Sequence, residues 1–192
     1  MGARLAQGMT IQYPRRRNRL RYPGYNYAQP GAVFVTICTY GRRPLFGTVD
    51  QGRMAYSPAG EMVLASWQRI PGKHREIVLD AFVVMPDHVH GVLFVGSGSE
   101  EGRKPPTVGD AVRWFKSVTV RGYGDGVKTH GWEPYERHLW QDKFHDRIVR
   151  SDAELEGIRA YILGNPARWW ERQEAERSEP WPRPMAPPTN DR

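Results

Sequence analysis

The sequence contains very little cysteine and no long hydrophobic stretch. Cys38 is the only cysteine among 192 residues, which excludes an internal disulfide framework and a zinc site built from several cysteines. Such cysteine usage fits a reducing cytoplasm. No apolar run approaches the roughly 18 residues of a membrane-spanning helix, and no apolar segment near the N-terminus resembles a signal peptide. We therefore expect a cytoplasmic protein that has no membrane attachment.

Acidic residues are absent from the first quarter of the chain. Eight arginines precede Asp50, the first acidic residue, and the formal net charge of the whole chain is +7. Of the 28 basic residues, the 20 that remain are balanced by all 21 acidic residues. An arginine-rich arm ahead of a near-neutral body is typical of proteins that bind nucleic acid. The charge alone is equally compatible with a solubilising tail.

Local patterns predict alternating strands and helices. The β-branched and aromatic runs are typical of strands, at residues 32–40, 77–85, 88–95 and 146–149. Because only Pro86-Asp87 separates the second run from the third, these two should form an antiparallel hairpin. N-capping residues followed by apolar positions at helical spacing mark helix starts at Ser57, Thr107 and Ser151. A glycine-rich loop is expected at 122–131.

The predicted order is strand, helix, strand, strand, helix, strand, helix. This is the split βαβ or ferredoxin-like order with an added C-terminal helix. We therefore expect an α+β protein in which helices pack on an RRM-like antiparallel sheet. Residues 1–25 are predicted to be a basic arm and 26–176 the folded domain. Residues 177–192 are predicted to be a disordered, proline-rich tail.

The first segment that can carry chemistry spans residues 85–90, with the sequence MPDHVH. Side chains alternate between the two faces of a strand, so His88 and His90 share a face and Val89 points the other way. Two imidazoles on one face can jointly ligate a divalent metal. Two polar residues on a solvated sheet face would produce the same pattern.

The second segment spans residues 161–166, with the sequence YILGNP. Tyr161 and Asn165 are four residues apart, and a helix would place them on the same side. A tyrosine hydroxyl can act as a covalent nucleophile, and an asparagine carbonyl oxygen can complete a metal shell. A packed tyrosine and an asparagine at a helix end are the structural alternatives.

Together, the two segments resemble the motifs of the single-tyrosine HUH transposases, the IS200-like family. The strand with histidine–hydrophobic–histidine resembles the HUH motif, and the single tyrosine within Y-I-x-x-N-P resembles the nucleophile helix of that family. Further segments resemble the branch called REP-associated tyrosine transposases, at residues 30–39, 43–47, 115–117 and 139–150. The resemblance extends over about residues 13–170.

The resemblance implies a metal-dependent endonuclease and strand transferase that acts on single-stranded DNA near hairpin repeats. By that pattern, Tyr161 attacks phosphorus and forms a 5′-phosphotyrosine intermediate, while His88 and His90 hold Mg²⁺ or Mn²⁺ with Asn165 as third ligand. No nucleotide cofactor is implied, and the expected location is the cytoplasmic nucleoid. Whether the protein forms a homodimer is left open by the sequence.

Basic residues are the candidates for contacts with DNA. They are Arg15, Arg16, Arg17, Arg19, Lys116, Arg147 and Arg150. Two other interpretations of the chain remain. A non-catalytic RRM-like nucleic-acid-binding module would keep the basic arm, but would not need the histidine pair together with Tyr161. A domesticated nuclease would process chromosomal hairpins without being mobile.

Overall fold

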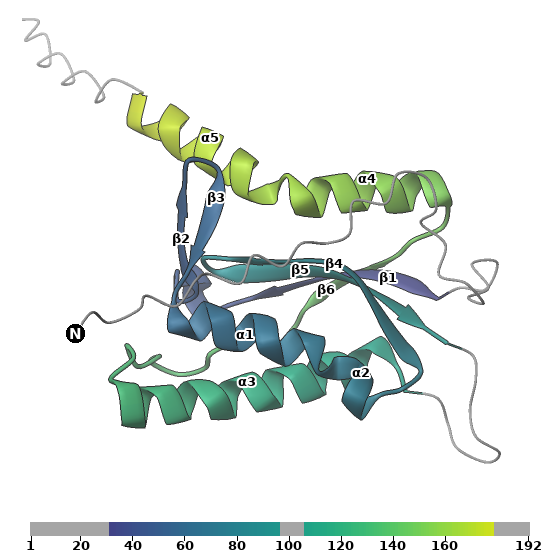
Figure 1. Cartoon of the computed structure of the whole chain (residues 1–192), viewed down its shortest axis with the longest axis horizontal. Coiled ribbons are helices and arrows are strands. Elements are labelled where there is room, and N and C mark those ends of the chain that lie inside the picture. The colour runs from purple at the N-terminus through teal and green to yellow at the C-terminus, as the bar shows by residue number, and fades with distance from the viewer. Residues whose placement is uncertain (1–30, 97–105, 179–192) are drawn as a thin grey trace, which may run out of the picture.

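The computed structural model describes residues 31–96 and 106–178 (Figure 1). The predicted arm at 1–25, with its four candidate arginines, lies outside the described residues, as does the predicted tail beyond Ser178. The elements, in chain order, are β1 (Ala32–Cys38), the 3₁₀ turn η1 (Tyr40–Arg42), β2 (Gly47–Asp50), β3 (Arg53–Tyr56), α1 (Pro58–Gln68), α2 (Ile70–Lys73), β4 (Ile77–Met85), β5 (His88–Val95), α3 (Val108–His130), β6 (His145–Ile148), α4 (Asp152–Leu163) and α5 (Asn165–Ser178).

Four strands form the main antiparallel sheet, in the order β4-β5-β1-β6. The expected hairpin joins β4 to β5, with Met85 opposite His88. In the centre of the sheet, Thr36 of β1 lies opposite His90 on one side and opposite His145 on the other. This arrangement confirms the α+β, ferredoxin-like prediction.

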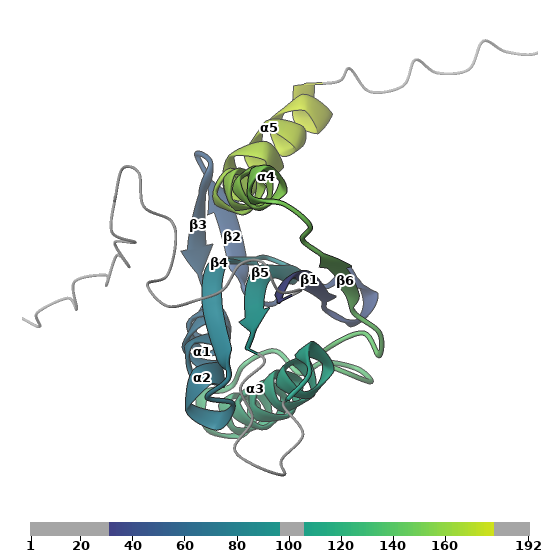
Figure 2. The same cartoon turned by 90° about the vertical axis from the view of Figure 1, so that its right-hand side faces the viewer.

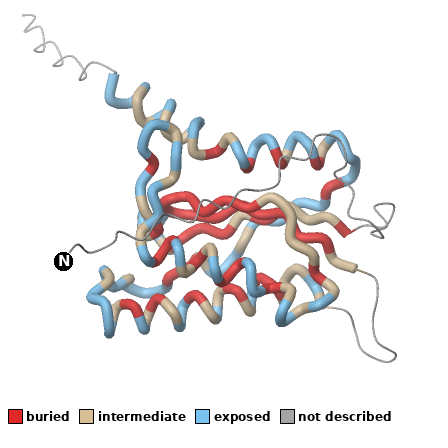
Figure 3. The backbone as a smooth tube through the Cα atoms, in the orientation of Figure 1, coloured by how far each residue is buried: buried red, intermediate tan, exposed pale blue. Residues whose placement is uncertain are grey.

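Helices cover both faces of the sheet (Figures 1 and 2). On one face, α1 and α3 pack against a core that includes Ile37, Val89 and Phe115. On the other face lie α4 and α5, over a second core that includes Val92 and Ile162. The central strand β5 is accordingly buried along nearly its whole length (Figure 3). Within residues 31–96 and 106–178, no helix has both the length and the hydropathy needed to cross a bilayer.

The glycine-rich stretch 122–131 is helical, so the loop prediction was wrong. It forms the second half of α3, and the helix ends only at Gly131, which adopts φ 67°. The buried side of the helix continues through Thr119, Tyr123 and Gly126. A Cβ at Gly126 would lie 2.2 Å from the Trp132 ring. Close packing against Trp132 therefore explains this glycine and outweighs its cost of about 1 kcal/mol in a helix.

The structure also contains a short hairpin that the sequence patterns did not predict. Strands β2 and β3 form a separate two-stranded sheet, with Gly47 opposite Tyr56. Each strand has only four residues, too few to show a clear alternation. The last helix is longer than expected, because α5 continues to Ser178.

Gly91 in the middle of β5 provides a test of core packing. A Cβ there would lie 2.4 Å from Cζ2 of Trp67 and 3.0 Å from the Phe82 ring, and these two rings are stacked with centroids 4.3 Å apart. We expect Gly91→Ala to lower the free energy of unfolding by about 2 kcal/mol, because overpacking forces neighbours to shift. Chemical denaturation measures the effect. Gly72→Ala is the control, since a Cβ there meets nothing within 4 Å, and equal midpoints for the two variants would contradict the packing argument.

Candidate active site

His88 and His90 lie side by side on the sheet face that α4 covers. Both side chains are buried, and their Nε2 atoms are 3.1 Å apart. They begin β5 and alternate with Val89, which points into the opposite core. The strand register thus places both imidazoles as the sequence predicted.

The outer nitrogen of each imidazole is held by a neighbour. Nδ1 of His88 is 2.5 Å from a carboxylate oxygen of the buried Asp87, and Nδ1 of His90 is 2.8 Å from the Thr36 hydroxyl. Asp87 is itself fixed by Arg42, whose Nε lies 2.9 Å from the other carboxylate oxygen. Hydrogen bonding at Nδ1 sets the ring orientation and leaves Nε2 directed into the site.

Burial lowers the pKa of His90 to about 3, with further lowering by the charges of His88 and Arg42. His90 is therefore neutral at physiological pH. A neutral imidazole is the form that binds a metal ion.

Tyr161 approaches the histidine pair from α4. Its hydroxyl is 3.4 Å from Nε2 of His90, and the two ring centroids are 5.3 Å apart. Phe34 packs edge-on against Tyr161 and stacks on His90. Tyr161 is 41% exposed, so this side chain lies beside the pair and is partly accessible from solvent.

The histidine pair fits a divalent ion in its donor type and spacing. Two nitrogens that each lie about 2.1 Å from one ion at a right angle are about 3 Å apart, which matches the observed 3.1 Å. Among the described residues, no group of three or more histidine, cysteine or acidic side chains could hold a metal. Further ligands would have to come from an amide, the substrate or water.

Asn165 is buried at the start of α5, immediately after the break at Gly164. Because α4 ends at Leu163, Tyr161 and Asn165 belong to different helices. The argument from spacing within a single helix therefore does not apply directly. The role of Asn165 as third ligand stays a prediction.

Arg168 is a neighbour of Tyr161 that the sequence reasoning missed. Its guanidinium lies 5.2 Å from the centroid of the Tyr161 ring, and Nη1 donates to the Tyr161 carbonyl oxygen at 2.9 Å. Because Arg168 lies beyond the break at Gly164, no spacing within a single helix pointed to this contact. Arg168 of α5 thus contacts both the backbone carbonyl of Tyr161, near the end of α4, and the Tyr161 ring.

The candidate DNA contacts divide between two regions. Arg147 on β6 is exposed and lies opposite Phe34, on the face that carries Tyr161. Arg150 is also exposed, and both arginines contact Glu154 at the start of α4. Lys116 belongs to α3 on the other side of the sheet, and its ammonium donates to two backbone carbonyls at 2.6 and 3.1 Å.

The helix that carries Tyr161 is fastened to the sheet by a buried ion pair. The Arg159 guanidinium makes a two-point contact with the Asp80 carboxylate of β4, and both side chains are no more than 10% exposed. Hydrogen bonding to Asp80 raises the pKa of Arg159, which stays charged. The pair thus lies two residues from Tyr161 along α4.

Removing the acid of this pair should be strongly destabilising. Asp80→Ala would leave the Arg159 charge buried without its main partner, and we expect a loss of about 3 kcal/mol in the free energy of unfolding. Urea denaturation monitored by tryptophan fluorescence measures it. Glu174→Ala removes the acid of an exposed pair with Arg177 and should cost at most about 1 kcal/mol. Similar losses in both variants would refute a special role for the buried pair.

Comparisons with known proteins identify the family of the chain. A family model described as "Transposase IS200 like" matches residues 61–165, more than half of the chain. A Haemophilus influenzae protein described as uncharacterized is 27% identical over 173 residues, which cover 82% of this chain and 92% of the relative.

A solved structure has a similar fold. It is a REP-associated tyrosine transposase bound to a REP hairpin, which superposes with a TM-score of 0.53 at 16% identity. The match covers 90% of this chain and 94% of that one. The family match spans both the histidine pair and Tyr161, and the chain belongs to the family of IS200-like transposases.

Proposed function

We propose that the protein cuts and rejoins single-stranded DNA through a covalent bond between Tyr161 and a 5′ phosphate. The observation that carries the proposal is the convergence of three groups from distant parts of the chain. The Tyr161 hydroxyl lies 3.4 Å from His90 Nε2, which lies 3.1 Å from His88 Nε2. A non-catalytic binding module would have no need of this arrangement.

In the proposed reaction, the Tyr161 oxygen attacks the scissile phosphorus and forms a Tyr–O–P bond. The bond from phosphorus to the 3′ oxygen breaks, the tyrosine proton passes to solvent, and the 3′ oxygen takes up a proton. Because the phosphodiester energy is conserved in the new bond, attack by a 3′-hydroxyl reverses the step and rejoins a strand. No nucleotide cofactor is needed.

His88 and His90 are the residues that would hold Mg²⁺ or Mn²⁺ in this proposal, with Asn165 as the candidate third ligand. Such an ion supplies polarisation of a non-bridging phosphate oxygen. The protein's own contribution is to keep both Nε2 atoms directed at one point, through Asp87 and Thr36.

Positive charge supports a DNA substrate. The exposed Arg147, which pairs with Glu154, lies on the face that carries Tyr161, the exposed Arg150 follows β6, and the net charge of the chain is +7. We propose a hairpin repeat as the target, since the REP-associated transposase with a similar fold was solved with a REP hairpin. In a cell, such a protein would work at the nucleoid, in the cytoplasm. A domesticated, non-mobile nuclease would use the same chemistry.

The direct test is covalent attachment. A hairpin oligonucleotide labelled at its 3′ end is incubated with the protein and Mg²⁺ or Mn²⁺, then separated on a denaturing gel. The proposal expects a labelled band at the combined mass of protein and downstream fragment. Cleavage with no such band would overturn the phosphotyrosine mechanism.

A further inference from the structure

A hollow lies away from the histidine pair, between α3 and the segment 135–142 that leads to β6. Its volume is about 400 Å³, which is within the size range of small-ligand sites. The lining includes Arg113, Lys116, Ser117, Tyr135, Arg137 and Gln141. We call this hollow the α3 groove.

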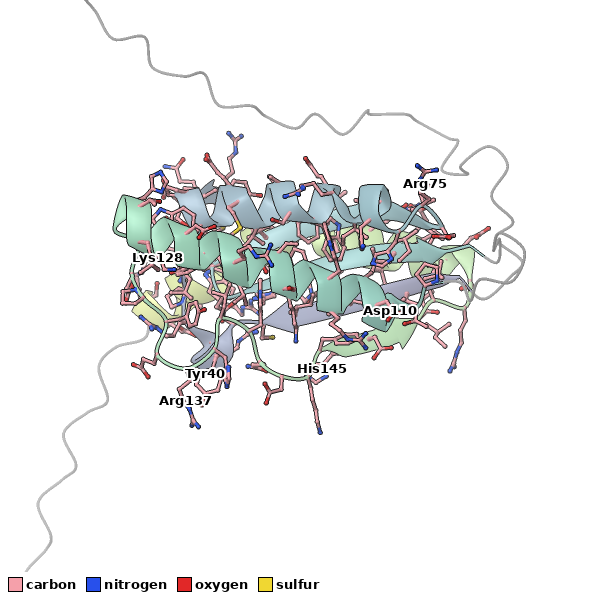
Figure 4. All side chains as sticks on the ribbon, turned by 90° about the horizontal axis from the view of Figure 1, so that it is seen from below. Tyr40, Arg75, Asp110, Lys128, Arg137 and His145 are labelled. Atoms are coloured by element: carbon pink, nitrogen blue, oxygen red, sulfur yellow. The ribbon has the colours of Figure 1, made fainter. Side chains whose placement is uncertain are left out.

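The rim of the α3 groove is cationic and aromatic. Arg113 is 80% exposed and pairs with Asp110 at 3.1 Å, whereas Arg137 has no acidic partner among the described residues. The Arg137 guanidinium lies 6.0 Å from the centroid of the Tyr40 ring, and His138 packs edge-on against the same ring at 5.7 Å. Figure 4 shows Tyr40 and Arg137 projecting from the same edge of the molecule. Tyr40 and Tyr135 are partly exposed, and accessible aromatic rings beside arginines are typical of surfaces that bind single strands.

The floor of the α3 groove is rigid. Leu139 and Trp140 are buried there, and Nε1 of Trp140 donates to the Thr119 hydroxyl at 2.8 Å. Lys116 ties the segment to α3 by donating to the carbonyl oxygens of Gln141 and Asp142. The burial of Trp140 removes it as a stacking platform and makes it part of a preformed site.

Polar groups that line the α3 groove are available to form hydrogen bonds with a ligand. Among the described residues, neither the Ser117 hydroxyl nor the Gln141 side-chain amide has a hydrogen-bond partner. The partly exposed Val120 provides an apolar wall, and Tyr135 packs against Tyr123. An apolar wall with hydroxyl and amide groups suits a flat, hydrogen-bonding nucleobase.

The segment that lines the α3 groove borders the strand next to the histidine strand. The Gln141 N–H donates to the Cys38 carbonyl at 2.9 Å, and Cys38 lies opposite His88 in the sheet. Neighbouring backbones in a sheet are about 4.8 Å apart, so only β1 lies between this segment and the histidine strand. The groove lies on the α3 side of the sheet and the histidine pair on the α4 side, so one DNA strand would reach both by passing around the end of β1.

We propose that the α3 groove binds one unpaired nucleotide of the DNA strand that Tyr161 cuts. The base lies against Val120 and Tyr135, within reach of Ser117 and Gln141, while Arg113 and Arg137 face the flanking phosphates. The inference rests on the proposed function, because it takes single-stranded DNA as substrate.

Photocrosslinking locates the bound strand without cleavage. The full chain is mixed, in EDTA, with a short thymidine oligonucleotide in which iododeoxyuridine replaces thymidine. The mixture is irradiated, the protein is digested, and the cross-linked peptides are identified by mass spectrometry. We expect cross-links in peptides that contain residues 113–120 or 135–142. Cross-links confined to other segments would overturn the proposal.

Variants distinguish DNA binding in the α3 groove from general electrostatic attraction between the protein and DNA. Ser117→Trp fills the groove from an exposed helix position, and should remove these cross-links and weaken binding roughly tenfold. Arg137→Ala should reduce the slope of log affinity against log salt by about one. Arg75→Ala is the matched control, since Arg75 is exposed and lies on the opposite side in Figure 4, and should change neither. Unchanged cross-links and salt slope in the groove variants would refute the site.

Different outcomes would overturn the nucleotide site and the Tyr161 chemistry. A phosphotyrosine adduct without cross-links in the α3 groove would overturn the nucleotide site and leave the Tyr161 chemistry standing. Cross-links in the groove without any adduct would overturn the chemistry and support the nucleotide site.

Discussion

Tyr161→Phe should abolish the covalent protein–DNA adduct and lower the rate of strand cleavage by roughly a thousandfold or more, because the attacking oxygen is gone. The substitution keeps the ring, so the edge-on contact with Phe34 and the Arg168 guanidinium over the ring remain possible. DNA binding and thermal stability should therefore stay close to those of the unchanged protein. The measurement is a denaturing gel with a hairpin strand labelled at its 3′ end, since that label follows the fragment joined to the protein.

Tyr56→Phe is the matched control for this substitution. Tyr56 is 38% exposed, close to the 41% of Tyr161, and lies on β3. It should form the adduct at the normal rate. An adduct that persists in Tyr161→Phe, or one that is lost equally in Tyr56→Phe, would show that another group is the nucleophile.

His90→Ala should remove metal-dependent cleavage. It deletes one of the two nitrogens that face each other at 3.1 Å, so the loss should exceed the ten- to hundredfold typical of residues that only support a ligand. His88→Ala should behave in the same way. Cleavage rates measured over a range of Mn²⁺ concentrations, together with the electron paramagnetic resonance signal of free Mn²⁺, separate lost binding from lost chemistry.

Two further variants make the metal prediction specific. His130→Ala removes an exposed histidine at the end of α3 and should leave Mn²⁺ binding unchanged. Asn165→Ala should weaken Mn²⁺ binding if its amide is the third ligand. Full cleavage by His90→Ala, or cleavage of normal rate in EDTA, would contradict a metal site at the histidine pair.

The sheet could be predicted from the sequence because its central strands are continuous β-branched runs bounded by clear turns. The pairing of His88 with His90 followed from strand alternation alone. The contacts that complete the site join residues far apart in sequence, such as Thr36 with His90 and Asp87 with Arg42. No local pattern carries that information.

The errors have an equally physical origin. Glycines at 122–131 suggested a loop, but Gly126 is needed where the helix meets the Trp132 ring. Packing between elements therefore decides a question that residue propensities answer differently.

The ion pair between Arg159 and Asp80 fastens α4 to the sheet. If this contact breaks, α4 can detach while the sheet stays folded. The histidine pair is held inside the sheet by neighbouring strands, whereas Tyr161 depends on how firmly α4 lies on β4. Detachment of one helix costs less free energy than global unfolding. As the protein is warmed or exposed to denaturant, Tyr161 should therefore move away from His88 and His90 before the sheet melts, and cutting should cease while the core between the sheet, α1 and α3 is still intact.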